Sequence, residues 1–141
     1  MDITAAAIEQ LNKRAPDFIR LLGGRIVDLD QIHNKVTFEF KVPLTYCHSG
    51  DIVQGGFVTA MADAAMSHSL FGTDDTISNI ATLEISTRFL GPTRGEQMLR
   101  VSGRVLKKTF RTAFLEAEMR DEEGTLLVSA QAVAKLARIA E

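Results

Sequence analysis

Hydrophobic and polar residues alternate along much of the chain, in the pattern typical of strands that bury one face. The clearest run lies at residues 35–42, and its apolar face holds Val36, Phe38, Phe40 and Val42. Four later runs, at residues 83–89, 99–105, 113–119 and 126–136, alternate in the same way, and residues 25–29 form a weaker candidate. Because the gaps between the later runs are short, we predict antiparallel hairpins and not crossovers through helices.

Two segments have helical patterns. Residues 3–22 are predicted to form a helix interrupted at Pro16, because proline is tolerated only in the first turn of a helix. Residues 54–71 are too long for a strand, rich in Ala and Met, and apolar on nearly every side, so we predict a helix buried in the core. The expected fold is therefore α+β, with one helix enclosed by a curved antiparallel sheet.

Length and composition narrow the function classes. The 141 residues are expected to form a single domain (1–141), with an N-terminal helical segment at 1–23 and the core at 24–137. A formal net charge of -2 argues against nucleic acid binding. With no membrane-length apolar window and no apolar signal core, we expect no membrane association and a cytoplasmic location. Cys47 is the only cysteine and the three histidines lack metal-ligand spacing, so no metal site is predicted.

Asp63 is the one carboxylate on the predicted central helix. Burying an unpaired carboxylate costs several kcal/mol or more, so the group needs hydrogen-bond partners or a chemical task. The hydroxyls of Thr59 and Ser67, each four residues away, are candidate structural partners. The residues alone leave both interpretations open, structural and catalytic.

Gly55 and Gly56 open the same helix. First-turn N–H groups have no acceptor within a helix, glycine allows close approach to the backbone, and the helix dipole favours a negative oxygen there. The pair also fits a crowded helix start that binds nothing. Together with the acid two turns further along, the Gly-Gly start would place an oxyanion-binding corner and a carboxylate on one helix.

These motifs resemble the hotdog-fold acyl-CoA thioesterases, in the phenylacetate-degradation (PaaI-like) branch, over residues 24–136. The family motif is His-Gly-Gly followed by a helix that bears Asp or Glu. This chain has Gln54-Gly55-Gly56 and then Ala62-Asp63-Ala64 at the family spacing. Further matches are Phe89-Leu90-Gly91-Pro92, Gly95-Glu96, Arg111 and Asp121-Glu122-Glu123-Gly124.

The resemblance implies a role for each matching residue. Asp63 would act as nucleophile toward the thioester carbonyl or as base for a water, and the Gly55 N–H would hold the carbonyl oxygen, with Gly56 beside it. Thr82 falls where this branch has a hydroxyl that orients the attacking group. The helix-start donor and the carboxylate would come from different subunits, so a homodimer or a homotetramer is expected. The implied partner is an acyl-CoA, and no cofactor is expected.

Two positions depart from the family pattern. Gln54 replaces the usual His, and His48 replaces an Asn often found six residues earlier. A glutamine side chain can hydrogen-bond a carbonyl but cannot shuttle a proton near neutral pH. His48 is a candidate for that polar role, or a simple loop residue.

A basic cluster and two rival functions complete the expectations. Lys107, Lys108 and Arg111 lie at a predicted hairpin, where they either face solvent or contact the phosphates of CoA. The first rival is a hotdog enoyl-CoA hydratase, which normally uses a His at the position of Gln54. The second is a non-catalytic acyl-CoA-binding or regulatory protein.

Overall fold

The computed structural model describes residues 2–139. The helices are α1 (Ile3–Arg14), α2 (Asp17–Leu21) and α3 (Gly55–Phe71), with a short 3-10 helix, η1, at Leu44–Tyr46. The strands are β1 (Gly24–Asp30), β2 (Lys35–Lys41), β3 (Cys47–His48), β4 (Ile52–Val53), β5 (Ile77–Phe89), β6 (Met98–Lys108), β7 (Thr112–Arg120) and β8 (Leu126–Arg138).

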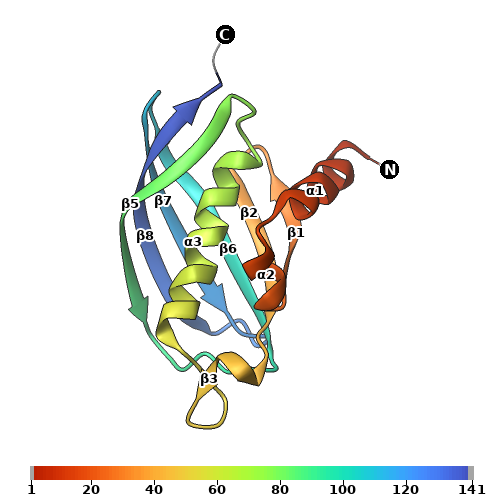
Figure 1. Cartoon of the computed structure of the whole chain (residues 1–141), viewed down its shortest axis with the longest axis vertical. Coiled ribbons are helices and arrows are strands. Elements are labelled where there is room, and N and C mark those ends of the chain that lie inside the picture. Colours follow the sequence, from red (N-terminus) through yellow and green to blue (C-terminus); the bar gives the residue numbers. More distant parts are fainter. Residues whose placement is uncertain (1, 140–141) are drawn as a thin grey trace.

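Six strands form one antiparallel sheet in the order β1-β2-β6-β7-β8-β5, and β3 and β4 form a small separate hairpin. The sheet curves around α3, which lies along its concave face, while α1 and α2 cover the β1 side (Figure 1). Strand order, antiparallel pairing and the central helix confirm the α+β hotdog fold predicted from the sequence.

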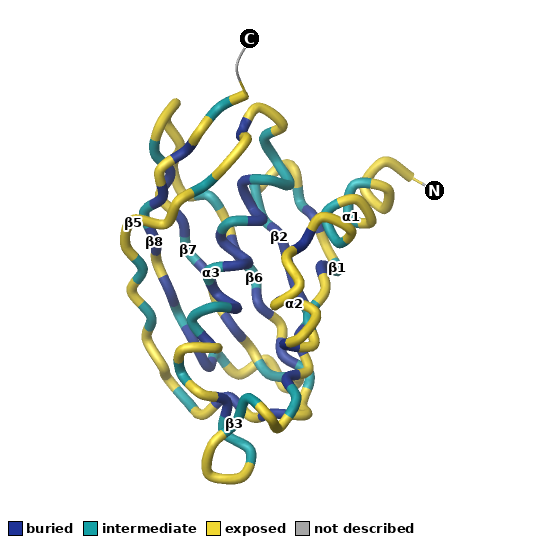
Figure 2. Tube along the Cα trace, in the orientation of Figure 1, coloured by how far each residue is buried: buried dark blue, intermediate teal, exposed yellow. Residues whose placement is uncertain are grey.

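Close backbone contact fixes α3 on the sheet. A Cβ atom at Gly103 of β6 would lie 2.3 Å from the backbone carbonyl of Ala65, so only glycine lets the helix approach this closely. Phe38 and Phe40 of β2 are fully buried in the core beside the helix. Burial is concentrated between α3 and the middle strands, whereas β5 is mostly exposed (Figure 2).

Most predicted elements are confirmed, including the break between α1 and α2 before Pro16. Two expectations were wrong. β5 begins at Ile77 and not at residue 83, and a bulge between Thr82 and Glu84 leaves Leu83 64% exposed. The central helix is not buried on every side, because Asp63 is only half-buried and Phe57 is 37% exposed. One face of α3 therefore lies open along β5.

The two edges of the sheet differ. At β1, the side-chain amide of Asn12 in α1 donates to the carbonyl of Ile26 (3.0 Å) and accepts from its N–H (2.8 Å), as a neighbouring strand would. At the other edge, no described strand pairs with the outer side of β5. No helix among residues 2–139 is long and apolar enough to cross a membrane.

Candidate functional site

A stripe of α3 residues spaced four apart faces β5. The hydroxyl of Thr59 donates to the hydroxyl of Thr87 (3.1 Å), and one turn later the hydroxyl of Thr82 donates to the Asp63 carboxylate (2.9 Å). Gly55 begins the same stripe one turn before Thr59. Helix periodicity therefore places the glycine corner and the carboxylate on one face, next to the open edge strand.

The structure brings together Asp63 and Thr82, two of the residues assigned to the site from the sequence. The hydroxyl partner of Asp63 is Thr82 and not Thr59 or Ser67, the two structural candidates on its own helix. Among the described residues, no Lys or Arg forms an ion pair with this carboxylate. Because a carboxylate has about four acceptor positions, one hydroxyl leaves capacity for a water or a substrate group.

The start of α3 has the free donors that an anionic oxygen needs. Gln54 caps the helix through its backbone only, and its side chain is exposed and makes no capping hydrogen bond. Within residues 2–139, the N–H groups of Gly55 and Gly56 have no backbone acceptor. The space where Gly56 would carry a Cβ is open for 4 Å, and the Phe89 ring lies 3.4 Å from the equivalent point at Gly55. A ligand oxygen can therefore reach this corner.

Gln54 directly precedes α3, and His48 on β3 pairs with Ile52, two residues before Gln54. His48 is exposed on β3, with its Nδ1 atom 3.1 Å from the Ser49 hydroxyl. The eight residues from Gly55 to Asp63 correspond to about 12 Å of helix rise, at ~1.5 Å per residue. One protomer therefore separates the helix-start group (Gln54, Gly55, Gly56, with His48 nearby) from the Asp63–Thr82 pair.

A cavity of about 830 Å³ runs along the open face of α3 and includes Asp63 in its lining. One wall comes from the α1–α2 region and the other from the segment that joins α3 to β5. The lining from α3 is Asp63, Ala64, Ser67, His68 and Phe71, and the walls include Leu11, Arg14, Phe18, Asp74, Ile77 and Asn79. The cavity therefore mixes apolar side chains with polar and charged ones, and its volume lies in the range of small-molecule sites.

Lys108 and Arg111 line a second, basic pocket of about 1110 Å³, at the β6–β7 hairpin and the end of β8. Lys135 and Arg138 lie in the same pocket, and sequence reasoning missed both because β8 is distant along the chain. Asp74 bonds the Lys108 ammonium and the Arg138 guanidinium, each at 2.8 Å.

Asp74 thereby neutralises part of the basic pocket. Burial opposes its ionisation, but hydrogen bonds from Lys108, Thr76 and Arg138 outweigh that effect and hold the pKa of the carboxyl well below its usual range. Arg111 is exposed and forms no ion pair within the described chain. Of the two cations assigned from the sequence, Arg111 is the better placed to meet a ligand phosphate.

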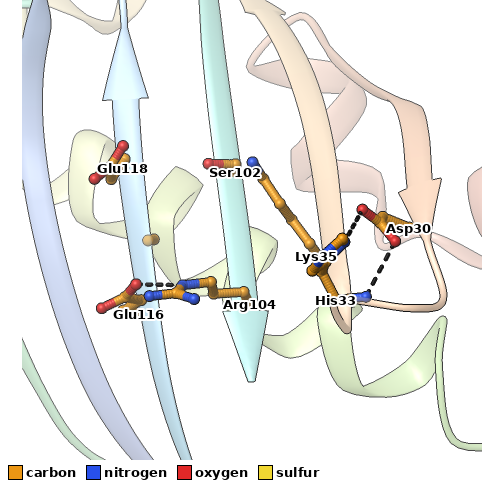
Figure 3. Close-up of a pocket in the computed structure, with 8 residues that line it drawn as sticks. Asp30, His33, Lys35, Ser102, Arg104, Glu116 and Glu118 are labelled. Carbon is orange, nitrogen blue, oxygen red and sulfur yellow. Dashed lines mark hydrogen bonds and ion pairs between the residues drawn. The ribbon is translucent and has the colours of Figure 1, made fainter. Parts of the chain in front are cut away.

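A third hollow, of about 430 Å³, lies on the outer face of the sheet (Figure 3). Within it, the His33 ring bonds the Asp30 carboxylate (2.7 Å) and Arg104 forms an ion pair with Glu116. No residue assigned to the site from the sequence lines it. Among residues 2–139, no group of three or more His, Cys, Asp or Glu side chains is placed to hold a metal ion.

A comparison with protein-family models identifies the family of the chain. The family model of the thioesterase superfamily matches residues 50–128, which hold α3, β5, β6 and β7. A search of curated proteins finds no match to the chain.

Solved structures with low sequence identity share the whole fold. The PaaI protein from the phenylacetic acid degradation operon of E. coli is 14% identical, with a TM-score of 0.81 over 99% of this chain and 97% of its own. Thioesterase HI1161 from Haemophilus influenzae is 16% identical, with a TM-score of 0.82 over 95% and 92%.

A hypothetical thioesterase from Streptococcus pneumoniae TIGR4, solved with coenzyme A, is 14% identical, with a TM-score of 0.78 over 95% of this chain and 99% of its own. At these identities the structural matches establish the fold, and the family model establishes the family. The chain belongs to the thioesterase superfamily and is a thioester hydrolase with a PaaI-like hotdog fold.

Proposed function

We propose that the protein hydrolyses acyl-CoA thioesters to the free acid and CoA. The observation that carries the proposal is the Asp63 carboxylate, held by Thr82 at a cavity, on the same helix whose first N–H groups lack acceptors. A carboxylate that attacks or activates water, together with donors for a developing oxyanion, is the minimum equipment for acyl transfer.

Two copies of the chain would form each site. An attacking carboxylate and an oxyanion donor must both lie within about 3 Å of their targets on one carbonyl group, whereas one helix separates them by about 12 Å. A second copy can supply the missing half. The open β5 edge supports this assembly, because Leu83, Phe89 and Leu90 along it are 64%, 54% and 56% exposed.

The contacts between α3 and β5 suggest how the copies pair. Gly55 lies against Phe89, and Asp63 bonds Thr82. An antiparallel pairing of β5 with its copy, about a two-fold axis near the middle of the strand, would bring the Phe89 end of one copy toward the Thr82 region of the other. The helix start of each copy would then approach Asp63 of its partner, giving two equivalent sites.

In this arrangement the charges develop where the protein can stabilise them. If Asp63 is the nucleophile, its free oxygen attacks the thioester carbon, the carbonyl oxygen becomes negative beside the Gly55 N–H, and the CoA thiolate leaves. Water then cleaves the resulting anhydride. If Asp63 is the base, it takes a proton from the attacking water. In both cases Thr82 orients the carboxylate, and the Gln54 amide is a further donor to the thioester oxygen.

The nucleotide end of the substrate would reach the basic pocket. Arg111 is the principal candidate for a phosphate contact, with Lys108 partly neutralised by Asp74. The coenzyme A in the Streptococcus pneumoniae neighbour supports CoA as the carrier. Gly56, at the open corner of α3, lets the thioester approach the helix start.

A thiol-release screen with short-chain, medium-chain, long-chain and aryl acyl-CoAs tests the proposal. Asp63→Asn keeps the shape of the side chain and removes its charge, so we expect turnover to fall about 10²–10⁴-fold while the fold survives. Asp28→Asn, an exposed change on β1, is the matched control and should retain activity. Asp63→Asn with turnover within a few-fold of wild type contradicts the assignment, and tight acyl-CoA binding without turnover in wild type favours a binding protein.

A further inference from the structure

Two oppositely charged side chains on β5, Glu84 and Arg88, have no charged partner among residues 2–139. Ser86 lies between them and opposite Gln131 of β8, which in turn lies opposite Glu116 on the outer face of the sheet. Directly opposite residues share a face of a sheet, and so do alternate residues of one strand. Glu84, Ser86 and Arg88 therefore all lie on the outer face, where all three are exposed.

Elsewhere on this face, opposite charges pair across neighbouring strands. Arg104 of β6, for example, forms an ion pair with Glu116 of β7 (Figure 3). The strand beside β5 offers no such partner, because β8 places uncharged residues opposite the two β5 charges, Val133 and Ser129. The two charges are four residues apart along β5, or about 13 Å, so they cannot pair with each other. A partner therefore has to approach from the open side of β5.

That open side is the edge of the sheet. β5 is its last strand, and no described strand pairs with the outer side of β5 (Figure 1). A second copy of β5, running antiparallel about a two-fold axis, covers this edge with an identical surface. When Ser86 of one copy lies opposite Ser86 of the other, Glu84 of each copy lies opposite Arg88 of the other. One symmetry operation thus makes two ion pairs.

Charge favours this axis over its neighbours. An axis at Glu84 or at Arg88 sets like charges opposite each other, which is destabilising, and an axis at Ile85 or Thr87 places neither charge directly opposite the other. Moving the axis by one residue shifts one copy past the other by two residues, or about 7 Å. Such a shift would disrupt a site shared between copies, because reacting groups must lie within about 3 Å of their targets.

Resting on the proposed function and its dimer, we infer that Glu84 and Arg88 form reciprocal ion pairs between two copies of the chain and fix the register of the paired β5 strands at Ser86. Both are positioning residues. They lie on the outer face, away from the substrate, and set where the helix start of one copy meets Asp63 of the other.

Charge reversal at the two positions tests the inference. Glu84→Arg alone brings two positive charges together at each pair, and Arg88→Glu alone brings two negative charges together, so each variant repels its own copy. Mixing the two variants restores both attractive pairs in the heterodimer. Heterodimers should therefore make up more than about 90% of the dimers after exchange, against about 50% for random mixing. Native mass spectrometry with one variant isotope-labelled measures this share without any turnover.

Lys41→Glu mixed with wild type is the matched control and should mix at random. Lys41 is an exposed lysine on β2, three strands away from β5, and forms no ion pair among the described residues. Thiol release from acyl-CoA should fall about tenfold or more in each reversal variant and return in their mixture. The double variant, with Glu84→Arg and Arg88→Glu in one chain, should dimerise and hydrolyse as wild type does, because both pairs keep opposite charges.

The outcomes separate the inference from the proposed function. Random mixing of the two reversal variants, or a wild type that stays monomeric at micromolar concentration, overturns the inference, while hydrolysis by wild type still supports a thioesterase. An excess of heterodimers without hydrolysis of any acyl-CoA by wild type supports the pairing and contradicts the proposed function. Should the single variants fail to fold, a folded double variant supports the pairing, and a double variant that also fails overturns it.

Discussion

Mixing two inactive variants offers the sharpest test of a site shared between copies. The first variant, Asp63→Asn, removes the carboxylate. The second, Gly56→Leu, fills the open space at the helix start, where nothing lies within 4 Å of the added Cβ, so the fold should tolerate it. In the proposed dimer, each variant alone has two damaged sites, so both variants should be inactive.

The heterodimer differs because Gly56 and Asp63 of one copy lie about 10.5 Å apart along α3 and would belong to different sites of the dimer. One of its sites combines the intact Asp63 of one copy with the intact helix start of the other, and its second site carries both lesions. Random exchange of equal amounts makes about half of the dimers heterodimers, each with one good site in two. The mixture should therefore recover about one quarter of the wild-type activity per site.

The assay is thiol release from an acyl-CoA before and after subunit exchange, with heterodimer formation verified by native mass spectrometry. A mixture of Asp63→Asn with wild type controls for exchange itself and should show only dilution. No recovery in a sample that contains the heterodimer would refute the shared site. The carboxylate and the helix-start donors would then act within one protomer or not on the same carbonyl.

Three further outcomes are expected. Gly103→Ala should lower the Tm measured by calorimetry by about 10 °C, because the new methyl group clashes with the α3 backbone. The shift follows from a destabilisation of ~3 kcal/mol divided by an unfolding entropy of ~0.3 kcal/mol/K for a chain of this length. Gly56→Ala, the control, should leave the Tm nearly unchanged. The ionised Asp74 stabilises the folded protein, and because its pKa is lowered this contribution is complete above pH ~4 and is lost below it. Asp74→Asn should therefore lower the urea midpoint at about pH 7 and flatten the decline of that midpoint in acid. An unchanged dependence of the midpoint on pH would contradict the stabilising role of Asp74. Arg111→Ala should raise the KM for acyl-CoAs but not for thioesters that lack the nucleotide. Lys108→Ala should have the same effect on KM and should also lower the Tm, because it removes the ion-pair partner of Asp74. An equal increase of KM for both types of substrate would argue against phosphate contact.

Most of the fold was predictable because burial imposes a period on the sequence. β2, β6, β7 and β8 each have one face against α3, so their apolar residues alternate and mark the strands. β5 lies at an edge and buries little, so its first half, from Ile77 to Thr82, shows no clean alternation, and its start was misplaced. The same edge leaves one face of α3 open, which apolar content alone did not indicate.

The candidate site was likewise predictable from the sequence only in part. The order of Gly55, Gly56 and Asp63, and the face they share, follow from helix periodicity and were fixed by the sequence alone. The packing of α3 and of the loop after it against the strands decided the other contacts. It set Thr82 against Asp63 across 19 residues and brought Asp74 to Lys108 across 34 and to Arg138 across 64. Only the tertiary structure shows such pairs, because no local pattern encodes which distant strands will lie side by side.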